Sequence, residues 1–181
     1  LLAAVITPFL GNYIDKKGKA ATMLILGSLL LIFCHLTFAF ILPEFRPEQG
    51  DTASVGGVIL ALATILVLGA SFSLVPASLW PSVPKLVDSK VIGSAYALIF
   101  WIQNIGLWLF PMLIGRILQS SNQDLINDSN IDEKLKPVMY NYTNPLLMLA
   151  FLGVAALVLG FVLKIVDRKK GLGLELPNIK K

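Results

Sequence analysis

Four long apolar runs, separated by polar stretches, dominate the hydrophobic pattern of the chain. They cover residues 20–42, 55–80, 90–118 and 144–166. As an α-helix, each run is long enough to cross a hydrocarbon core of about 30 Å at about 1.5 Å per residue. A fifth run, residues 1–10, is too short to span alone and predicts the end of a further transmembrane helix. The pattern therefore predicts an all-α, multi-pass membrane protein.

The polar stretches predict the connections between these helices. Residues 11–19 form a charged, glycine-bounded hinge, and loops are predicted at residues 43–54, 81–89 and 119–143, with a polar tail at 167–181. The chain begins inside an apolar run, without the charged leader and small-residue cleavage site of a signal peptide. We therefore expect it to be the C-terminal piece of a longer protein.

Basic residues are distributed unevenly over the two sides of this topology. The side that carries the hinge, the loop 81–89, the tail and the adjoining helix ends holds eleven of the fifteen lysines and arginines. Cytoplasmic loops carry such an excess in membrane proteins. The hinge and the tail are therefore predicted to be cytoplasmic, and the loops 43–54 and 119–143 are predicted to lie on the outer side.

The composition supports the membrane assignment and excludes other classes. The chain is 56% hydrophobic and 14% charged, against about 25% charged residues in soluble domains. The net charge of +4 does not come from a basic stripe interleaved with aromatic residues, so no nucleic-acid partner is expected. The single Cys34 excludes an intrachain disulfide and a cysteine metal cluster.

No residues are spaced as an enzyme active site requires. The only histidine, His35, adjoins Cys34, and adjacent side chains point to different faces of a helix. Zinc-protease, P-loop and nucleophile-elbow motifs are absent from the sequence. We expect no enzymatic activity, no cofactor and no metal. His35 itself fits either a structural role or a proton relay, because its ordinary pKa is easily moved.

Polar residues inside the spans are the candidate functional residues, because polar groups in lipid are costly and tend to face a cavity or another helix. One face of the run 90–118 carries Tyr96, Phe100, Gln103, Asn104, Leu107 and Pro111. Gln103 and Asn104 lie near mid-span, and their amides offer both donors and acceptors to a neutral or zwitterionic solute. The candidate cavity set is completed by Tyr96 and Phe100 of the same run and by Ser71 of the preceding one. The alternative is that the amides bond a neighbouring helix, which is worth about 0.6 kcal/mol on average.

Small residues in two spans predict close helix packing. Gly69 and Ser73 form such a pair in the run 55–80, and Gly153, Ala156 and Gly160 recur along the last run. Trp80 lies at the inner end of its run, where tryptophan typically anchors a helix at the membrane interface.

The hinge resembles a cytoplasmic loop motif of the major facilitator superfamily. The pattern G-x-x-x-D-x-x-G-[KR] is matched by Gly11, Asp15, Gly18 and Lys19. That superfamily repeats the motif after the second and the eighth of twelve helices. The resemblance therefore implies that this chain runs from the end of helix 8 through helix 12. It also implies that Asp15 pairs with a helix in the missing N-terminal half, so we expect Asp15 to be unpaired or locally capped here.

Further stretches resemble the branch of the superfamily that includes a lysosomal dipeptide transporter and bacterial relatives. They are residues 34–40, 79–81, 93–96 and 102–106. The resemblance implies a secondary transporter that moves a small polar solute, such as a dipeptide, by alternating access. It also implies that helices 8, 10 and 11 line the cavity, which favours Tyr96, Gln103 and Asn104.

The implied partners are the solute, the lipid bilayer and the N-terminal half of the same protein. A bacterial inner membrane is favoured by the short, lysine-rich inner loops, and a lysosomal membrane is expected in a eukaryote. Two alternatives stay open: a non-transporting assembly subunit, and a transporter of another substrate such as an organic anion or a drug.

Overall fold

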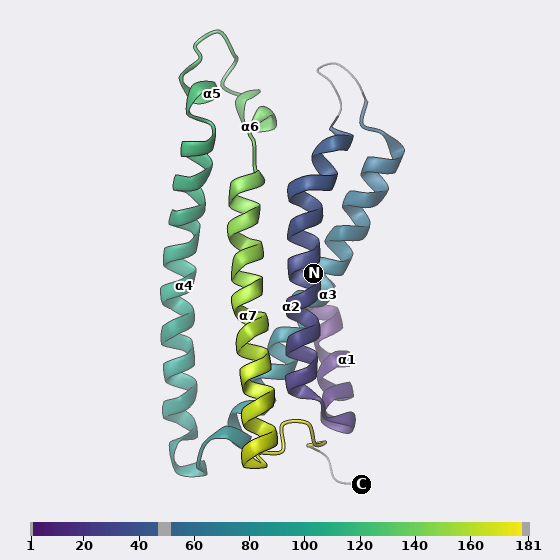
Figure 1. Ribbon diagram of the computed structural model, residues 1–181, viewed down its shortest axis with the longest axis vertical. Helices are drawn as coiled ribbons and strands as arrows, with labels where there is room; N and C mark the ends of the chain where they lie inside the picture. The colour runs from purple at the N-terminus through teal and green to yellow at the C-terminus, as the bar shows by residue number, and fades with distance from the viewer. Residues whose placement is uncertain (1, 47–51, 179–181) are drawn as a thin grey trace.

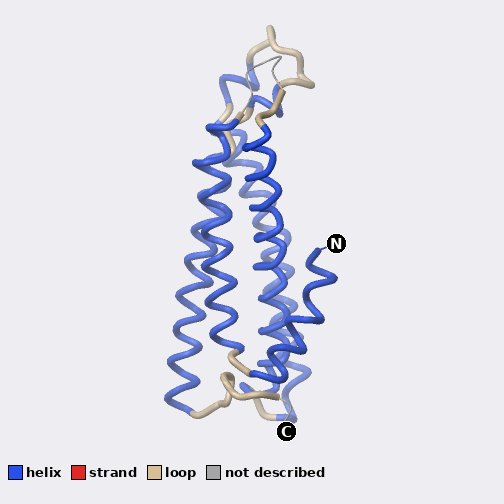
Figure 2. Tube along the Cα trace, turned by 90° about the vertical axis from the view of Figure 1, so that its right-hand side faces the viewer, coloured by secondary structure: helices blue, strands red, loops and turns tan. Residues whose placement is uncertain are grey.

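A bundle of long helices forms the molecule. The computed structural model describes residues 2–46 and 52–178, and within these ranges every regular element is helical. Figures 1 and 2 show the long helices running along the same axis. They are α1 (Leu2–Lys17), α2 (Ala20–Leu36), α3 (Val55–Leu86), α4 (Ile92–Ser121) and α7 (Thr143–Lys170), with the short α5 (Gln123–Asn127) and α6 (Lys136–Met139) at one end.

Four helical segments are long and apolar enough to cross a membrane: Ala20–Phe45, Val55–Leu86, Ser89–Ser121 and Thr143–Lys170. A helix satisfies its own backbone hydrogen bonds, which is what an apolar span in lipid requires. The prediction of an all-α, multi-pass membrane protein is confirmed.

Helix α1 extends through most of the predicted hinge. It ends at Lys17, so the connection to α2 consists of Gly18 and Lys19 alone. Ile14 is 1% exposed and packs with Ala20 and Ala77, and this burial favours a continued helix. Gly18 ends the helix with a φ of 76° and donates its N–H to the Ile14 carbonyl at 2.7 Å, as glycine commonly does at helix C-termini.

Helix α3 also exceeds its predicted length. It passes through Pro81 and Pro84 and ends at Leu86, so most of the predicted loop 81–89 is helical. The turn η3 (Ser89–Val91) then leads into α4. Ser82 and Val83 are buried, and the packing of this last turn offsets the hydrogen bonds that the prolines cannot make.

The end of the first full span changes helix type before Pro43. A π-helical turn, η1 (Thr37–Ile41), follows α2, and a 3₁₀ turn, η2 (Leu42–Phe45), follows η1. Pro43 has no N–H to give the carbonyl four residues earlier, which belongs to Ala39. The Thr143 hydroxyl of α7 donates to that carbonyl at 3.4 Å. Residues 47–51 of the predicted loop, including Glu48 and Asp51, lie outside the described residues.

Helix α2 packs between α3 and α7 through small residues. A side chain at Gly153 or Gly160 of α7 would place its Cβ 2.8 Å from Ile32 Cγ1 or 3.1 Å from Ile25 Cγ1 of α2. On the side facing α3, the buried Cys34 thiol lies 3.6 Å from the Thr64 carbonyl. The predicted packing role of Gly153 and Gly160 is confirmed.

Helix α4 stands apart from this packed group. None of its residues is buried, and Figure 1 shows it at the edge of the bundle, beside α7. At the end that carries α5 and α6, Asn122 links it to the start of α7. The Asn122 side chain donates to the Leu118 and Asn141 carbonyls at 2.8 and 3.1 Å, and accepts from the Asn141 N–H at 2.7 Å.

Replacing Asn122 by alanine is expected to lower the free energy of unfolding by about 1–3 kcal/mol, because it removes the three hydrogen bonds made by a side chain that is only 7% exposed. The free energy is measured by denaturant titration of the purified protein. Asn130→Ala is the matched control, because Asn130 is exposed and its side chain makes no hydrogen bond within the described residues. Equal effects of the two substitutions would contradict this role.

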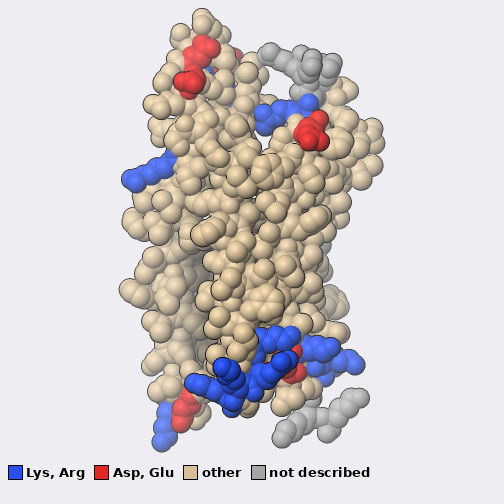
Figure 3. All heavy atoms as spheres, viewed as in Figure 1, with Lys and Arg blue, Asp and Glu red and all other residues tan. Residues whose placement is uncertain are grey.

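Lysines and arginines gather at the end of the bundle formed by the α1–α2 turn and the C-terminus of α7 (Figure 3). The exposed ones there are Lys16, Lys17, Lys19, Arg168, Lys169 and Lys170. The middle of this face shows no charged side chain. The cytoplasmic assignment of this end stays a prediction based on the positive-inside rule.

Candidate functional site

Two neighbouring amide side chains are exposed near the middle of α4. Gln103 and Asn104 lie on the part of the surface that no other described helix covers. The Asn104 amide donates to the Phe100 carbonyl of its own helix at 2.7 Å, and no described residue donates to its oxygen. Within the described residues, the Gln103 side chain makes no hydrogen bond. Gln103 therefore keeps both its donors and its acceptor available.

Tyr96 and Phe100 lie one to two turns from these amides and contact Trp80 of α3. The ring centroids of Trp80 and Phe100 are 5.0 Å apart, and those of Trp80 and Tyr96 are 5.7 Å apart. The Tyr96 hydroxyl donates to the Trp80 carbonyl at 3.1 Å. Such offset aromatic contacts are worth about 0.5–1.5 kcal/mol beyond burial. They join α4 to α3 below the two amides.

Trp80 thus belongs to the site. From the sequence alone, it was predicted only to anchor its helix at the membrane interface. Position along the helix indicated an anchor, whereas the contact with Tyr96 and Phe100 depends on how α3 and α4 fold back on each other. The signal in the sequence was the short spacing between the two helices, which brings the end of α3 close to the start of α4.

Ser71 is separated from the rest of the candidate set. It is 0% exposed, and its hydroxyl donates to the Leu68 carbonyl at 2.8 Å. Its own carbonyl would lie 3.3 Å from a Cβ at Gly27 of α2, so Ser71 belongs to the contact between α2 and α3. Ser78, two turns along, is also buried, and its hydroxyl has no hydrogen-bond partner within the described residues. Of the other candidates, Gln103, Asn104 and Phe100 are exposed and Tyr96 is half-buried.

Asp15 of the motif is paired, contrary to the expectation that it would be unpaired or locally capped. Its carboxylate accepts from the Asn178 side chain at 2.7 Å, and its carbonyl accepts from the Asn178 N–H at 2.9 Å. The partner comes from the polar tail, whose position at the α1–α2 turn no local pattern reveals. Gly11 has open space around it, and Lys19 adopts a left-handed φ of 66°.

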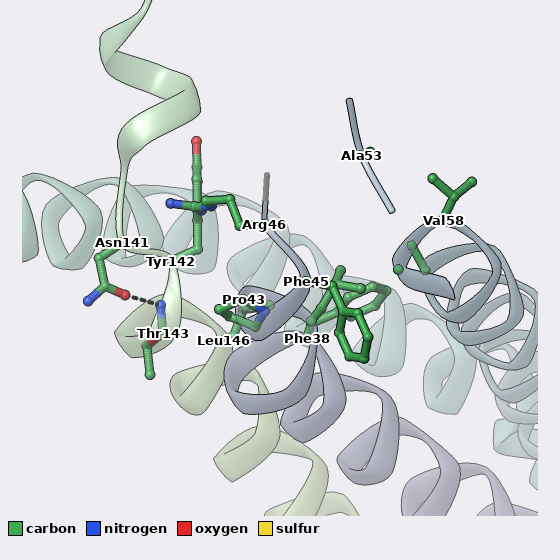
Figure 4. Close-up of a pocket in the computed structure, with 13 residues that line it drawn as sticks. Phe38, Pro43, Phe45, Arg46, Ala53, Val58, Asn141, Tyr142, Thr143 and Leu146 are labelled. Atoms are coloured by element: carbon green, nitrogen blue, oxygen red, sulfur yellow. Dashed lines mark hydrogen bonds between the residues drawn. The ribbon is translucent and has the colours of Figure 1, made fainter. Parts of the chain in front are cut away.

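An open groove of about 750 Å³ lies at the opposite end of the bundle, away from all of these candidates. Phe38, Phe45 and Val58 contribute its apolar wall, and Arg46 and Asn141 lie at its polar edge (Figure 4). The Arg46 guanidinium donates to the Tyr140 carbonyl at 3.2 Å. The groove contains none of the predicted cavity residues.

No candidate metal site is present in the part of the chain that the structure describes. No group of three His, Cys, Asp or Glu side chains comes close enough there to hold a metal ion. His35 is half-buried, and its Nδ1 lies 2.7 Å from the Leu31 carbonyl of its own helix. Within the described residues, no carboxylate forms a hydrogen bond or ion pair with His35, so its environment fits the structural role.

Comparison with known proteins identifies relatives among transporters. The chain is 28% identical over 126 residues to lysosomal dipeptide transporter MFSD1 of Mus musculus, which covers 70% of this chain and 24% of that protein. The protein of the same name is 29% identical over 118 residues in Danio rerio and 28% identical over 120 residues in Homo sapiens. No family model and no solved structure matches.

The chain spans about a quarter of the length of these curated relatives. Their names describe transporters rather than enzymes. The match to the mouse protein covers more than two thirds of this chain. The matched proteins are lysosomal dipeptide transporters by name, which is the branch that the sequence stretches resemble. The resemblance of this chain to the lysosomal dipeptide transporter branch of the major facilitator superfamily is confirmed.

Proposed function

We propose that the chain is the C-terminal part of a secondary transporter that moves a small polar solute, such as a dipeptide, across a membrane. The observation that carries the proposal is the pair of exposed amides, Gln103 and Asn104, halfway along an apolar helix. An uncovered amide facing lipid would cost free energy, because lipid offers no hydrogen-bond partner. These amides therefore need a water-filled cavity, a solute or another helix.

The chemistry of the amides suits a zwitterionic or neutral solute. An uncharged side chain with two donors and one acceptor group can bond an ammonium, a carboxylate or a peptide group without the penalty of an unpaired buried charge. Tyr96 and Phe100 add aromatic surface beside them. The names of the relatives support dipeptides as the first substrates to test.

Alternating access requires two halves that rock about a site near the membrane midplane. In this proposal, the N-terminal half of the longer protein faces α4 and closes the cavity. The few contacts of α4 with its neighbours fit this role, since residues 100–105 are all exposed and are available to that half. The membrane of residence follows the organism: a lysosomal membrane in a eukaryote and the inner membrane in a bacterium.

The test is solute counterflow in proteoliposomes that contain the full-length protein. Vesicles loaded with unlabelled dipeptide are expected to accumulate labelled dipeptide transiently, whereas protein-free vesicles and vesicles loaded with a sugar are not. Absence of counterflow for every dipeptide, free amino acid and organic anion tried would favour the assembly-subunit alternative. Counterflow of an organic anion alone would keep the transporter and replace its substrate.

A further inference from the structure

The last described residues, 171–178, form a strap that crosses the ends of four helices. It begins at Gly171, which ends α7 with a φ of 63°, and it returns over the α1–α2 turn (Figure 1). Leu174, in the middle of the strap, is 0% exposed. A terminal segment this short could lie free in solvent, so its buried leucine indicates specific docking.

The strap supplies hydrogen-bond acceptors to the first turn of α2. The first amides of a helix have no partner within the helix, and Lys19, at the N-cap position, makes no side-chain cap. The carbonyls of Glu175 and Leu174 accept from the N–H groups of Lys19 and Ala20 at 3.1 and 3.2 Å. The Glu175 carboxylate accepts from the Thr22 N–H at 2.9 Å and from its hydroxyl at 2.8 Å. Glu175 therefore acts as the N-cap of a helix that begins 155 positions earlier in the numbering.

This cap is favoured electrostatically as well as geometrically. A carboxylate near the N-terminus of a helix interacts favourably with the helix dipole. Lys164 of α7 adds a further contact, because its ammonium donates to the Thr22 hydroxyl at 2.7 Å. The charges of Glu175 and Lys164 thus meet at Thr22, the third residue of α2.

The other helices are tied to the same strap. Lys85, at the end of α3, donates to the carbonyls of Gly173 and Leu176 at 2.9 and 2.8 Å. Asp167 of α7 accepts from the Leu174 N–H at 2.9 Å. Asn178 holds Asp15 of α1 through the two hydrogen bonds described above. Within the described residues, the strap makes no hydrogen bond to α4.

We propose that the strap is a conformational latch. When docked, it joins the ends of α1, α2, α3 and α7 into one unit and holds Asp15, while α4 stays outside that unit. When released, it removes the cap from α2, frees Asp15 for another partner and loosens the α1–α2 turn. The strap is therefore a two-state element located at the motif turn, and the proposal does not depend on which solute is carried.

Gly18 provides a way to force the latch open. A Cβ at this position would overlap the carbonyl carbon and oxygen of Glu175, which are backbone atoms that cannot move aside without the strap. Gly171 is the matched control, since its φ of 63° gives a similar left-handed strain while no atom lies within 4 Å of its Cβ. Only Gly18→Ala should displace the strap.

The experiment measures hydrogen–deuterium exchange of the full-length protein by mass spectrometry, on peptides that cover the start of α2. Glu175→Ala and Gly18→Ala are each expected to speed exchange of the first-turn amides at least tenfold. Glu133→Ala, an exposed acidic residue at the other end, and Gly171→Ala should leave the rate within twofold of the unsubstituted protein.

Unchanged exchange in Glu175→Ala, or equal rates in Gly18→Ala and Gly171→Ala, would overturn the latch. If Glu175→Ala does not fold, Glu175→Gln decides the matter: an amide keeps one acceptor for the Thr22 N–H, so an intermediate rate supports the latch and an unchanged rate contradicts it. Because the readout is backbone exchange rather than uptake, failure here leaves the transport proposal standing, and failure of counterflow leaves the latch standing.

Discussion

Replacing Gln103 by alanine in the full-length protein is expected to lower solute uptake by about tenfold to a hundredfold. A hydrogen bond to a charged group contributes about 1.5–3 kcal/mol, and each 1.4 kcal/mol is a factor of ten. The charged ends of a zwitterionic solute supply such groups. Uptake is measured as initial rates over a range of solute concentrations in proteoliposomes that hold equal amounts of protein.

Gln119→Ala is the matched control, because Gln119 is the same residue type on the same helix, exposed near its polar end. Its substitution should leave uptake within twofold. Asn104→Ala should cost less than Gln103→Ala, since the Asn104 amide nitrogen is already bonded to Phe100. If Gln103→Ala lowers the melting temperature and leaves uptake per folded molecule unchanged, the amide bonds a neighbouring helix and lines no cavity.

Replacing Gly153 by leucine is expected to destabilise the protein by about 1–3 kcal/mol, the usual effect of adding volume to a packed contact. A Cβ at this position would lie 2.8 Å from Ile32 Cγ1 and 3.6 Å from the Ile32 backbone nitrogen. The remaining atoms of a leucine would therefore push α7 away from α2. The free energy of unfolding is measured by titrating the detergent-solubilised protein with SDS.

Gly56→Leu separates this packing effect from the gain in helix propensity, which is about 1 kcal/mol in a helix interior. Gly56 is a helical residue of α3 with no atom within 4 Å of a Cβ, so its substitution should be neutral or stabilising. Equal losses at the two positions would show that the α2–α7 contact does not depend on the absence of a side chain at Gly153.

Local sequence patterns predicted the existence of the helices more accurately than the residues at which they end. The apolar runs gave four spans because backbone groups in lipid must bond within the segment itself. The ends differ from prediction where a contact between distant residues outweighs a local stop signal. Ile14 packs against α2 and α3 and keeps α1 helical to Lys17, and the buried Ser82 and Val83 keep α3 helical beyond Pro81.

Periodicity likewise predicted which residues share a face of one helix, but not what that face meets. Gln103 and Asn104 are exposed on α4, as are the residues beside them, while Ser71, another polar residue in an apolar helix, is buried against α2. Helical spacing is the same in both cases. The difference arises from which helices pack together, and no single helix carries that information.

The sequence by itself determined that this chain is a helical membrane protein, how many full spans it has and which motif joins the first two helices. These properties depend on the lengths of apolar runs and on residues close together in the chain. Only the tertiary structure decided that Asn178 pairs with Asp15, that Glu175 caps α2 and that Trp80 meets Tyr96. The two tail contacts join residues more than 150 positions apart, and all three depend on packing geometry that no local pattern encodes.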